Sequence, residues 1–314
     1  MRLVTRLLLL CVLTMSVARG ADATGLAFVV NSRSASISLI DMTKLVELRR
    51  VPVLREPHHL ALSPDGKYLL VGDTVGNEMF FLDPNTGEVE HRLPIADPYQ
   101  LGFSPNAKWL VVNGLGRDQI DVYDAATMKL IKRFPISSMP SHLAFSPDGD
   151  KVYVSLQGSN RLVAIDLTRL AVIWNVPVGN TPAGVLWNRD HVLVADMGTD
   201  YVAEVDPATG RVINRVRTGS GAHQLFASPD GKQIYVNNRV AGTITVLDAA
   251  TLANLRTYHV PGGPDDLAFA PDGSIWITCR FAEKIAVLNP ATGQLRTVEV
   301  GRQPHGIFLN SAAP

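Results

Sequence analysis

The sequence contains few cysteines. Only two of its 314 residues are cysteine, Cys11 and Cys279, and the first lies in an apolar N-terminal segment. If that segment is removed, the remaining thiol has no partner within the chain. The fold must then be stabilised by packing and strand pairing rather than by internal disulfides. We expect Cys279 to be a small buried residue rather than a reactive thiol.

The sequence also lacks an excess of positive charge. Lys+Arg and Asp+Glu number 29 each, and charged residues make up 18% of the chain. This balance argues against a general nucleic-acid binder, because such a protein needs basic residues to neutralise phosphates. The 46% apolar content suffices for a core and excludes a disordered polyelectrolyte. A Gly-rich phosphate loop, a Gly-x-Ser-x-Gly nucleophile motif and a Cys-x-x-Cys-His haem motif are all absent from the sequence.

The N-terminus has the layout of a secretory signal peptide. Arg2 and Arg6 precede an apolar run over residues 7–17, and small residues follow it. This run is too short to span a bilayer. We therefore predict a signal peptide over residues 1–20 and a mature N-terminus near Ala21 or Thr24. The mature protein is expected to be periplasmic or secreted and to have no transmembrane span.

A repeat with a period of about 41 residues runs through the rest of the chain. Short β-rich runs end in Asp or Asn at intervals of 42, 41, 42, 40, 42 and 41 residues. These runs end at Asp41, Asp83, Asp124, Asp166, Asp206, Asp248 and Asn289. Seven copies at one period indicate a repeat architecture.

Each copy contains four short apolar or alternating runs separated by turn residues. Pro-Asp-Gly follows the first run in four copies, and Pro-Asn-Thr-Gly or Pro-Ala-Thr-Gly follows the third run in three. Pro fixes one turn torsion, Asp can bond nearby backbone, and Gly accepts positive φ. Four strands in each 41-residue unit predict an all-β, seven-bladed β-propeller with four antiparallel strands per blade. In the 40-residue copy, residues 184–194 lack Pro-Asp-Gly, so a shorter first hairpin is expected there.

The two ends of the repeat complement each other. The first copy begins at its second run, residues 25–31, and the chain finishes with an unpaired first run, residues 304–310. We predict that the C-terminal strand completes the first blade, since this closure hides two open sheet edges. Residues 25–310 then form a single domain, which we expect to be monomeric.

The second runs "VYVS" (152–155) and "IYVN" (234–237), with "SPDG" before them and "AID" or "VLD" after, resemble the YVTN-type β-propeller repeat. The resemblance covers about residues 25–310 and implies an exported bacterial propeller. The segments 114–123 and 56–71 are similar to those of lactonase-type propellers, although no residue set here completes a lactonase site. A more distant likeness is to the haem-d1-binding propellers, which use axis-facing His and Arg to hold an anionic tetrapyrrole.

Five of the eight histidines fall at the start of the first runs. When the seven first runs are aligned on their first core residue, the two preceding positions define fourteen slots. The candidate ligand-binding residues in these slots are His58, His59, Tyr99, His142, His223, Asp265, Asp266 and His305. The first strand of a propeller blade lines the axis, so these slots should form a polar rim around the channel.

Arginines are expected on the same rim. Arg33, Arg239 and Arg280 follow the second runs at what reads as one equivalent position, with Asp73 and Asp196 one position earlier in two other blades. Asp265 and Asp266 should interrupt the ring of positive charge on one side. Guanidiniums donate to carboxylates and phosphates, so the rim predicts a small anionic ligand. A metal ion is the other candidate, with His58, His223 and His305 as possible ligands.

Two interpretations of the rim stay open at this point. In the first, the histidines are ordinary exposed loop residues. In the second, they form a site on a rigid scaffold, so replacing His58 and His305 with Ala should weaken binding or activity while leaving the melting temperature nearly unchanged. We interpret the chain as an exported binding or scaffold protein with a ligand or partner site on this rim. The alternatives are a periplasmic protein that handles a tetrapyrrole, or a metal-assisted hydrolase or lactonase. Whether the protein is an enzyme, and which ligand or periplasmic protein partner it takes, stay open.

Overall fold

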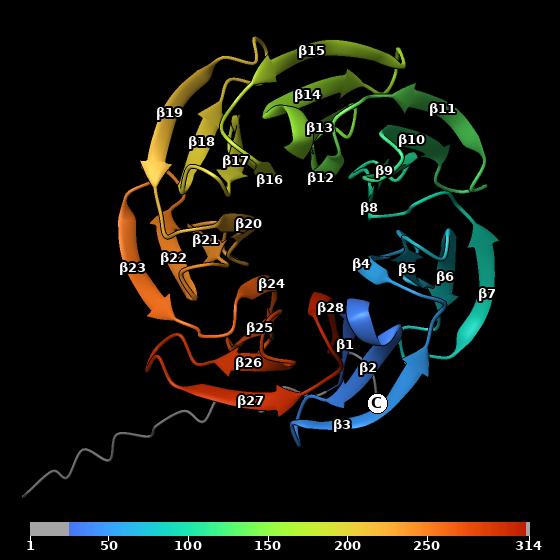
Figure 1. The fold of residues 1–314 in the computed structure, drawn as a ribbon, viewed down its shortest axis with the longest axis vertical. Helices are drawn as coiled ribbons and strands as arrows, with labels where there is room; N and C mark the ends of the chain where they lie inside the picture. Colours follow the sequence, from blue (N-terminus) through green and yellow to red (C-terminus); the bar gives the residue numbers. More distant parts are fainter. Residues whose placement is uncertain (1–24, 312–314) are drawn as a thin grey trace, which may run out of the picture.

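Seven four-stranded antiparallel sheets surround one axis in the computed structural model, which describes residues 25–311 (Figure 1). The predicted seven-bladed β-propeller is therefore confirmed. The predicted signal peptide lies outside the described residues. Within residues 25–311, no helix has the length and apolar character needed to cross a membrane.

The four strands of each blade are the four runs of the sequence repeat. The inner strands, which line the axis, are β4 (Pro57–Leu62), β8 (Gln100–Phe103), β12 (Pro140–Phe145), β16 (Pro182–Asn188), β20 (Ala222–Ala227), β24 (Pro264–Phe269) and β28 (Pro304–Asn310). The second strands are β1 (Leu26–Asn31), β5 (Leu69–Asp73), β9 (Trp109–Gly114), β13 (Lys151–Leu156), β17 (His191–Asp196), β21 (Gln233–Asn238) and β25 (Ile275–Cys279).

The outer half of each blade follows the same order. The third strands are β2 (Ser36–Asp41), β6 (Glu78–Leu82), β10 (Gln119–Asp124), β14 (Arg161–Asp166), β18 (Tyr201–Val205), β22 (Thr243–Asp248) and β26 (Lys284–Leu288). The outermost strands are β3 (Val46–Pro52), β7 (Val89–Pro94), β11 (Leu130–Pro135), β15 (Ala171–Pro177), β19 (Val212–Arg217), β23 (Asn254–His259) and β27 (Leu295–Glu299). Two short 3-10 helices, η1 (Ser32–Ser34) and η2 (Gln157–Ser159), follow β1 and β13.

The core lies between neighbouring blades. Seven apolar clusters fill the seven interfaces, and each draws on the second and third strands of two adjacent sheets. These strands are buried along nearly their whole length because they pack on both faces, whereas the outermost strands are mostly exposed. Cys279 is a free, fully buried residue of one cluster, as expected.

The C-terminal strand closes the ring. β28 pairs with β1, with Ile307 opposite Val29 and Asn310 opposite Leu26. Ile307 also contributes to the cluster between the last blade and the first. The predicted closure is therefore confirmed, and the described ends of the chain lie side by side.

The turn residues act as the sequence predicts. In the first hairpin of the second blade, Asp65 Oδ1 accepts a hydrogen bond from Ser63 Oγ at 2.7 Å, and Gly66 has a φ of 71°. The blade that contains residues 184–194 has the shorter first hairpin that was expected, in which Asn188 pairs directly with His191.

The loops divide between two faces of the ring. One face, here called the mouth face, holds the loops from each second strand to the third and from each outermost strand to the next inner strand. The opposite face, here called the turn face, holds the Pro-Asp-Gly turns and the turns after each third strand. β1 begins and β28 ends at the turn face. The inner strands begin at the mouth face, so the predicted site residues lie at that end of the channel.

Candidate functional site

A β-bulge begins nearly every inner strand. Pro57 of β4 pairs with Asp73, but the next pair is Leu60 with Val71, so His58 and His59 together face the single residue Gly72. Corresponding shifts occur at the start of β12, β16, β20, β24 and β28. Neighbouring residues of a regular strand point to opposite faces, whereas a bulge re-aims one of them. Both members of the adjacent pair can therefore contribute to one cluster.

Five imidazoles meet in the channel. They belong to four different blades, and their exposed fractions lie between 0% and 5%. The ring centroids of His58 and His305 are 3.7 Å apart, those of His59 and His305 4.6 Å apart, and those of His142 and His223 5.1 Å apart. We call the set His58, His59, His142, His223 and His305 the imidazole cluster.

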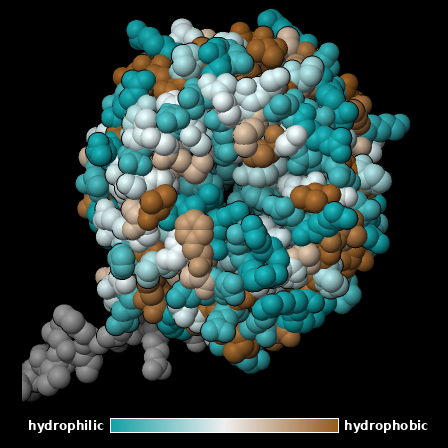
Figure 2. Space-filling model, viewed as in Figure 1, coloured by the Kyte–Doolittle hydropathy of each residue, from teal (hydrophilic) through white to brown (hydrophobic). Residues whose placement is uncertain are grey.

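The burial of this cluster corrects the interpretation of its members as exposed loop residues. Each imidazole lies in the first residues of an inner strand and is packed against its counterparts from other blades, because the channel is narrow at this end. The expectation that replacing them would hardly affect melting therefore no longer holds. Viewed along the axis, hydrophilic residues surround the hollow in the middle of the molecule (Figure 2).

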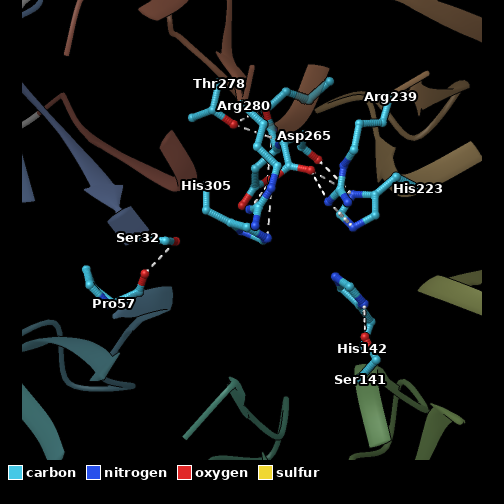
Figure 3. Close-up of polar contacts among 12 residues, drawn as sticks. Ser32, Pro57, Ser141, His142, His223, Arg239, Asp265, Thr278, Arg280 and His305 are labelled. Atoms are coloured by element: carbon cyan, nitrogen blue, oxygen red, sulfur yellow. Dashed lines mark hydrogen bonds and ion pairs between the residues drawn. The ribbon is translucent and has the colours of Figure 1, made fainter. Parts of the chain in front are cut away.

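Asp265 is the anionic centre of the site. Its Oδ1 forms an ion pair with the Arg239 guanidinium, and its Oδ2 lies 3.3 Å from Nη1 of Arg280 (Figure 3). Oδ2 also lies 3.2 Å from Nε2 of His305, and Oδ1 lies 3.3 Å from Nδ1 of His223. Asp265 therefore neutralises part of the arginine charge, instead of interrupting the positive ring as expected.

Arg239 occupies the space between His223 and Asp265. Its Nη2 lies 2.5 Å from Nε2 of His223. A guanidinium is always a donor, so this His223 nitrogen is the acceptor and the Nδ1–H faces Asp265. His223, Asp265 and His305 have ligand atoms within 4.8 Å of one another. Arg239 already serves as the cation of this group.

The imidazoles are neutral at physiological pH. Burial lowers the pKa of His59 and of His223 to about 3. Burial, assisted by the positive charge of neighbouring groups, also holds the pKa of His58, His142 and His305 well below its usual range.

The carboxyl groups behave in opposite ways. Burial opposes ionisation of Asp265, but the positive charges of Arg239 and Arg280 outweigh it and lower the pKa. Burial, together with the charge of Asp265, raises the pKa of Asp266 to about 8. At neutral pH the site then holds two guanidiniums and one carboxylate, which leaves one net positive charge.

Several imidazole nitrogens have no hydrogen-bond partner among the described residues. They are His58 Nδ1, His59 Nε2, His142 Nε2 and His305 Nδ1. Burying a polar atom without a partner costs free energy, and native proteins contain few such atoms. The ligand atoms of His58, His59 and His305 lie within 4.8 Å of one another. This triad, here called the open triad, has the donor set of a metal site.

Arg33 does not join the other two arginines. Strand pairing aligns Asn31 with Asn238 and Cys279, because each pairs with the first residue of the third strand. Ser32 therefore corresponds to Arg239 and Arg280, and Arg33 stands one position later. Its side chain is exposed on η1, whereas those of Arg239 and Arg280 are 18% and 17% exposed. The predicted equivalence of the three arginines is thus wrong.

The other predicted residues lie around the cluster. Tyr99 packs against His58 with a centroid distance of 4.0 Å and the rings tilted by 33°, and burial raises the pKa of Tyr99. Asp266 lies in the wall of the channel, where its backbone N–H donates to Thr278 Oγ1. Asp73 and Asp196 are buried at the ends of β5 and β17 rather than on the rim.

Sequence reasoning missed two residues that orient His142. Ser141 Oγ lies 2.7 Å from Nδ1 of His142 and accepts a hydrogen bond from Nε2 of Gln157. The signal was available in the sequence, because Ser141 occupies the same slot as His58, and Gln157 occupies the same slot as Arg239.

The fold and the cluster define a seven-bladed β-propeller with an imidazole-lined channel. The chain belongs to the YncE-like β-propeller family, whose model matches residues 9–314. The curated relatives include the uncharacterized protein YncE of Salmonella typhimurium, which is 30% identical over 80 residues, and its Salmonella typhi counterpart, which is 29% identical over 80 residues. Each alignment covers 26% of this chain and 22% of the relative, so the chain spans less than a quarter of either relative's length.

Solved structures share the fold at low sequence identity. A functionally unknown protein from Desulfotomaculum acetoxidans aligns with a TM-score of 0.79 and 14% identity over 91% of this chain and 99% of its own. A putative 6-phosphogluconolactonase from Bacteroides uniformis aligns with a TM-score of 0.74 and 17% identity, again over 91% of this chain and 99% of its own. The dihydro-heme d1 dehydrogenase NirN aligns with a TM-score of 0.69 and 15% identity over 92% of this chain and 76% of its own. These likenesses show the fold alone.

Proposed function

We propose that this chain is an exported binding protein that holds one transition-metal ion at the open triad, His58, His59 and His305. The observation that carries the proposal is the convergence of buried, neutral imidazoles whose nitrogens lack partners within residues 25–311. Neutral imidazole is the form that binds metal, so protons need not be removed from the ligands first. The signal peptide predicted over residues 1–20 is the reason for expecting export.

The size of the triad suits a single ion. Ligand atoms within 4.8 Å of one another need to close by only ~1 Å to surround an ion at the usual metal–nitrogen distance of about 2.0 Å. Small rotations of the three rings suffice. His142 and Tyr99 pack beside the triad and limit how far the rings can turn away.

Among the ions that imidazole binds, the charge of the site favours copper(I). Imidazole suits copper and zinc, whereas calcium and magnesium take oxygen ligands. The positive charge left by Arg239, Arg280 and Asp265 repels a divalent ion about twice as strongly as a monovalent ion at the same position. The carboxylate that could offset a second positive charge is already paired with both guanidiniums.

A tetrapyrrole suits this geometry less well than an ion. Ring centroids 3.7–5.2 Å apart around His59 and His305 leave no space for a macrocycle among the imidazoles. It would have to lie above them, against the partly exposed Arg239 and Arg280. The visible spectrum of protein purified from its native compartment distinguishes the two, because a tetrapyrrole absorbs there and copper(I) or zinc(II) bound by imidazoles does not.

Metal titration of the mature protein tests the proposal. We expect one copper(I) ion per chain when copper is supplied under anaerobic reducing conditions in competition with a chromophoric chelator. His58→Phe and His305→Phe keep a ring in the space but remove the ligand nitrogen. Each should weaken binding by at least about 100-fold, which exceeds the usual effect of losing a group that only orients a ligand.

Matched controls decide between this site and the other histidines. His91 and His259 lie exposed on outermost strands, and their replacement by Phe should leave copper affinity unchanged. Circular dichroism and melting curves establish that each variant is folded. Copper binding that is equal in the cluster variants and the control variants, or absent from the wild type, would refute the proposal.

A further inference from the structure

Two guanidiniums at the channel mouth share one carboxylate. Arg239 and Arg280 follow β21 and β25, and both reach Asp265 (Figure 3). Asp265 is fully buried, and the two arginine side chains are 18% and 17% exposed. Other arginines of the mouth-face loops, such as Arg33 and Arg302, are exposed. Arg239 and Arg280 therefore differ from these arginines in being largely withdrawn from water.

The two guanidiniums carry more N–H donors than the site provides acceptors. Nη2 of Arg239 contacts both His223 and Asp265, and Nη1 of Arg280 contacts Asp265. No hydrogen bond within residues 25–311 uses Nη1 of Arg239, or Nε and Nη2 of Arg280. Nε of Arg239 is buried and also lacks a partner among these residues. Arginine stays protonated in proteins, so these donors need water or an acceptor that enters from the mouth.

The site also holds an uncompensated charge. Arg239 and Arg280 contribute two positive charges, and Asp265 contributes one negative charge, because the guanidiniums lower its pKa. Asp266 is mostly protonated at neutral pH, since burial and the charge of Asp265 raise its pKa to about 8. Arg239, Arg280 and Asp265 are also the charged groups that act on His223. One positive charge therefore remains among side chains that water reaches poorly.

Other carboxylates of the mouth face keep their charge but do not pair with these guanidiniums. Within residues 25–311, Asp265 is the only acidic residue that forms an ion pair with Arg239 or Arg280. Asp200, for example, accepts hydrogen bonds from Gly221 N and Ser220 Oγ instead. The positive excess is therefore local to the two guanidiniums, and it is not a property of the whole mouth face.

A positive charge that is partly withdrawn from water favours an anion as its partner. Taking an unpaired charge out of water costs free energy, and an anion that supplies both charge and acceptors offsets this cost. A carboxylate fits guanidinium donors because its two oxygens accept from neighbouring N–H groups. Its single negative charge equals the excess in the site, whereas sulfate or doubly charged phosphate would leave one negative charge there.

We propose that Arg239 and Arg280 bind the carboxylate group of a small organic monoanion at the channel mouth. The packed imidazole rings leave no space for the rest of the molecule, so it extends toward solvent. Side chains that are 18% and 17% exposed admit a small group rather than the surface of a folded protein. These donors do not belong to the open triad, so carboxylate binding stands independently of copper binding.

Fluorine NMR with trifluoroacetate as the probe tests this site in the metal-free mature protein. We expect the trifluoroacetate resonance to shift or broaden in a saturable way when protein is added. Acetate should displace the probe, whereas acetamide, which has a similar shape but no charge, should not. Sulfate at equal ionic strength should displace the probe less well than acetate. Because metal is removed first, the result is separate from that of the copper titration.

Two variants should change the affinity in opposite directions. Arg280→Gln leaves Arg239 and Asp265 as a balanced pair, so trifluoroacetate binding should weaken by at least about 10-fold. Asp265→Asn removes the competing carboxylate and raises the net positive charge, so binding should tighten by at least about 10-fold. The matched control is Arg33→Gln, which removes an exposed guanidinium from the same face and should bind as the wild type does.

Circular dichroism and melting curves establish that each variant is folded. Arg280→Gln keeps Asp265 paired with Arg239, so it tests the site even if Asp265→Asn does not fold. The proposal is overturned if the wild type shows no saturable binding, if acetamide displaces the probe as well as acetate does, or if sulfate displaces it better. Unchanged affinity in Arg280→Gln, or in folded Asp265→Asn, would overturn it as well.

Discussion

The mouth face and the turn face are built from opposite ends of the same strands, yet they differ in chemistry. At the turn face, half-buried aspartates such as Asp206 and Asp248 stabilise the turns by accepting backbone N–H groups. At the mouth face, some carboxylates, such as those of Asp73 and Asp265, are fully buried, imidazole nitrogens lack partners among the described residues, and single apolar loop residues are exposed. The repeated turn residues therefore lie at the turn face, whereas the residues at the mouth face differ from blade to blade and can form a site.

Removing the last strand should unfold the ring, and with it the difference between the mouth face and the turn face. Deleting residues 303–314 takes His305 from the cluster and exposes the edge of β1. It also removes Ile307 and Leu309 from the core, and burial of each such side chain is worth about 1.5–3 kcal/mol. We expect loss of the cooperative thermal transition. Deleting only residues 312–314 is the control, and an unchanged melting temperature after the longer deletion would contradict the closed ring.

The second prediction compares a buried carboxylate with a half-buried one. Asp73 accepts N–H groups of Arg55, Glu56 and Gly76 at 2.7–2.9 Å. Asp73→Ala leaves these donors partly buried without an acceptor, so it should lower the free energy of unfolding by about 2–4 kcal/mol. Asp248→Ala removes a turn acceptor whose donors lie near solvent and can bond to water instead, so it should lower the free energy of unfolding by much less than Asp73→Ala does. Urea denaturation measures both changes. Equal losses of unfolding free energy would contradict the claim that the Asp73 carboxylate satisfies donors that water cannot reach.

Asp196 occupies the position of Asp73 in another blade, but its carboxylate oxygens have no hydrogen-bond partner among the described residues. Burial raises its pKa from 3.8 to about 8. Between these values the folded protein keeps the proton that the unfolded chain loses, so the free energy of unfolding falls as pH rises. Asp196→Asn removes this slope, which is about 1.4 kcal/mol per pH unit at most.

The Asp196 variant should therefore gain stability relative to the wild type as pH rises from 3.8 to about 8. Urea denaturation at several pH values measures the difference. A constant difference across this range would show that Asp196 is ionised in the folded state.

The smallest expected effect concerns selectivity at the mouth. Arg280→Gln leaves Arg239 and Asp265 as a balanced pair, so the repulsion of a second positive charge decreases. The ratio of zinc(II) to copper(I) affinity should rise by about 10-fold. Arg302→Gln, an exposed change on the same face, should leave the ratio unaltered. If Arg280→Gln leaves the ratio unaltered, the charge of Arg280 does not determine which ion the site prefers.

The repeat made the fold predictable, because the turn residues and the Asp-ending runs appear in register along the chain. The same register located His58, His142, His223 and His305 at the start of inner strands. It could not show their burial, which depends on how closely seven strands approach at the axis.

Two further features depended on local geometry. No pattern of residue types in the sequence indicates the bulge that brings both His58 and His59 into the cluster. The position of Arg33 was misread because the strand pairing, not the visual likeness of "VVNSR" and "VNNR", defines equivalent residues.

Anomalous diffraction at the copper edge from crystals of copper-loaded protein tests the central claim most directly. We predict one strong peak between the imidazole rings of His58, His59 and His305, with Arg239 still between His223 and Asp265. A peak at His91, His191 or His259, or the absence of a peak in the channel, would contradict it.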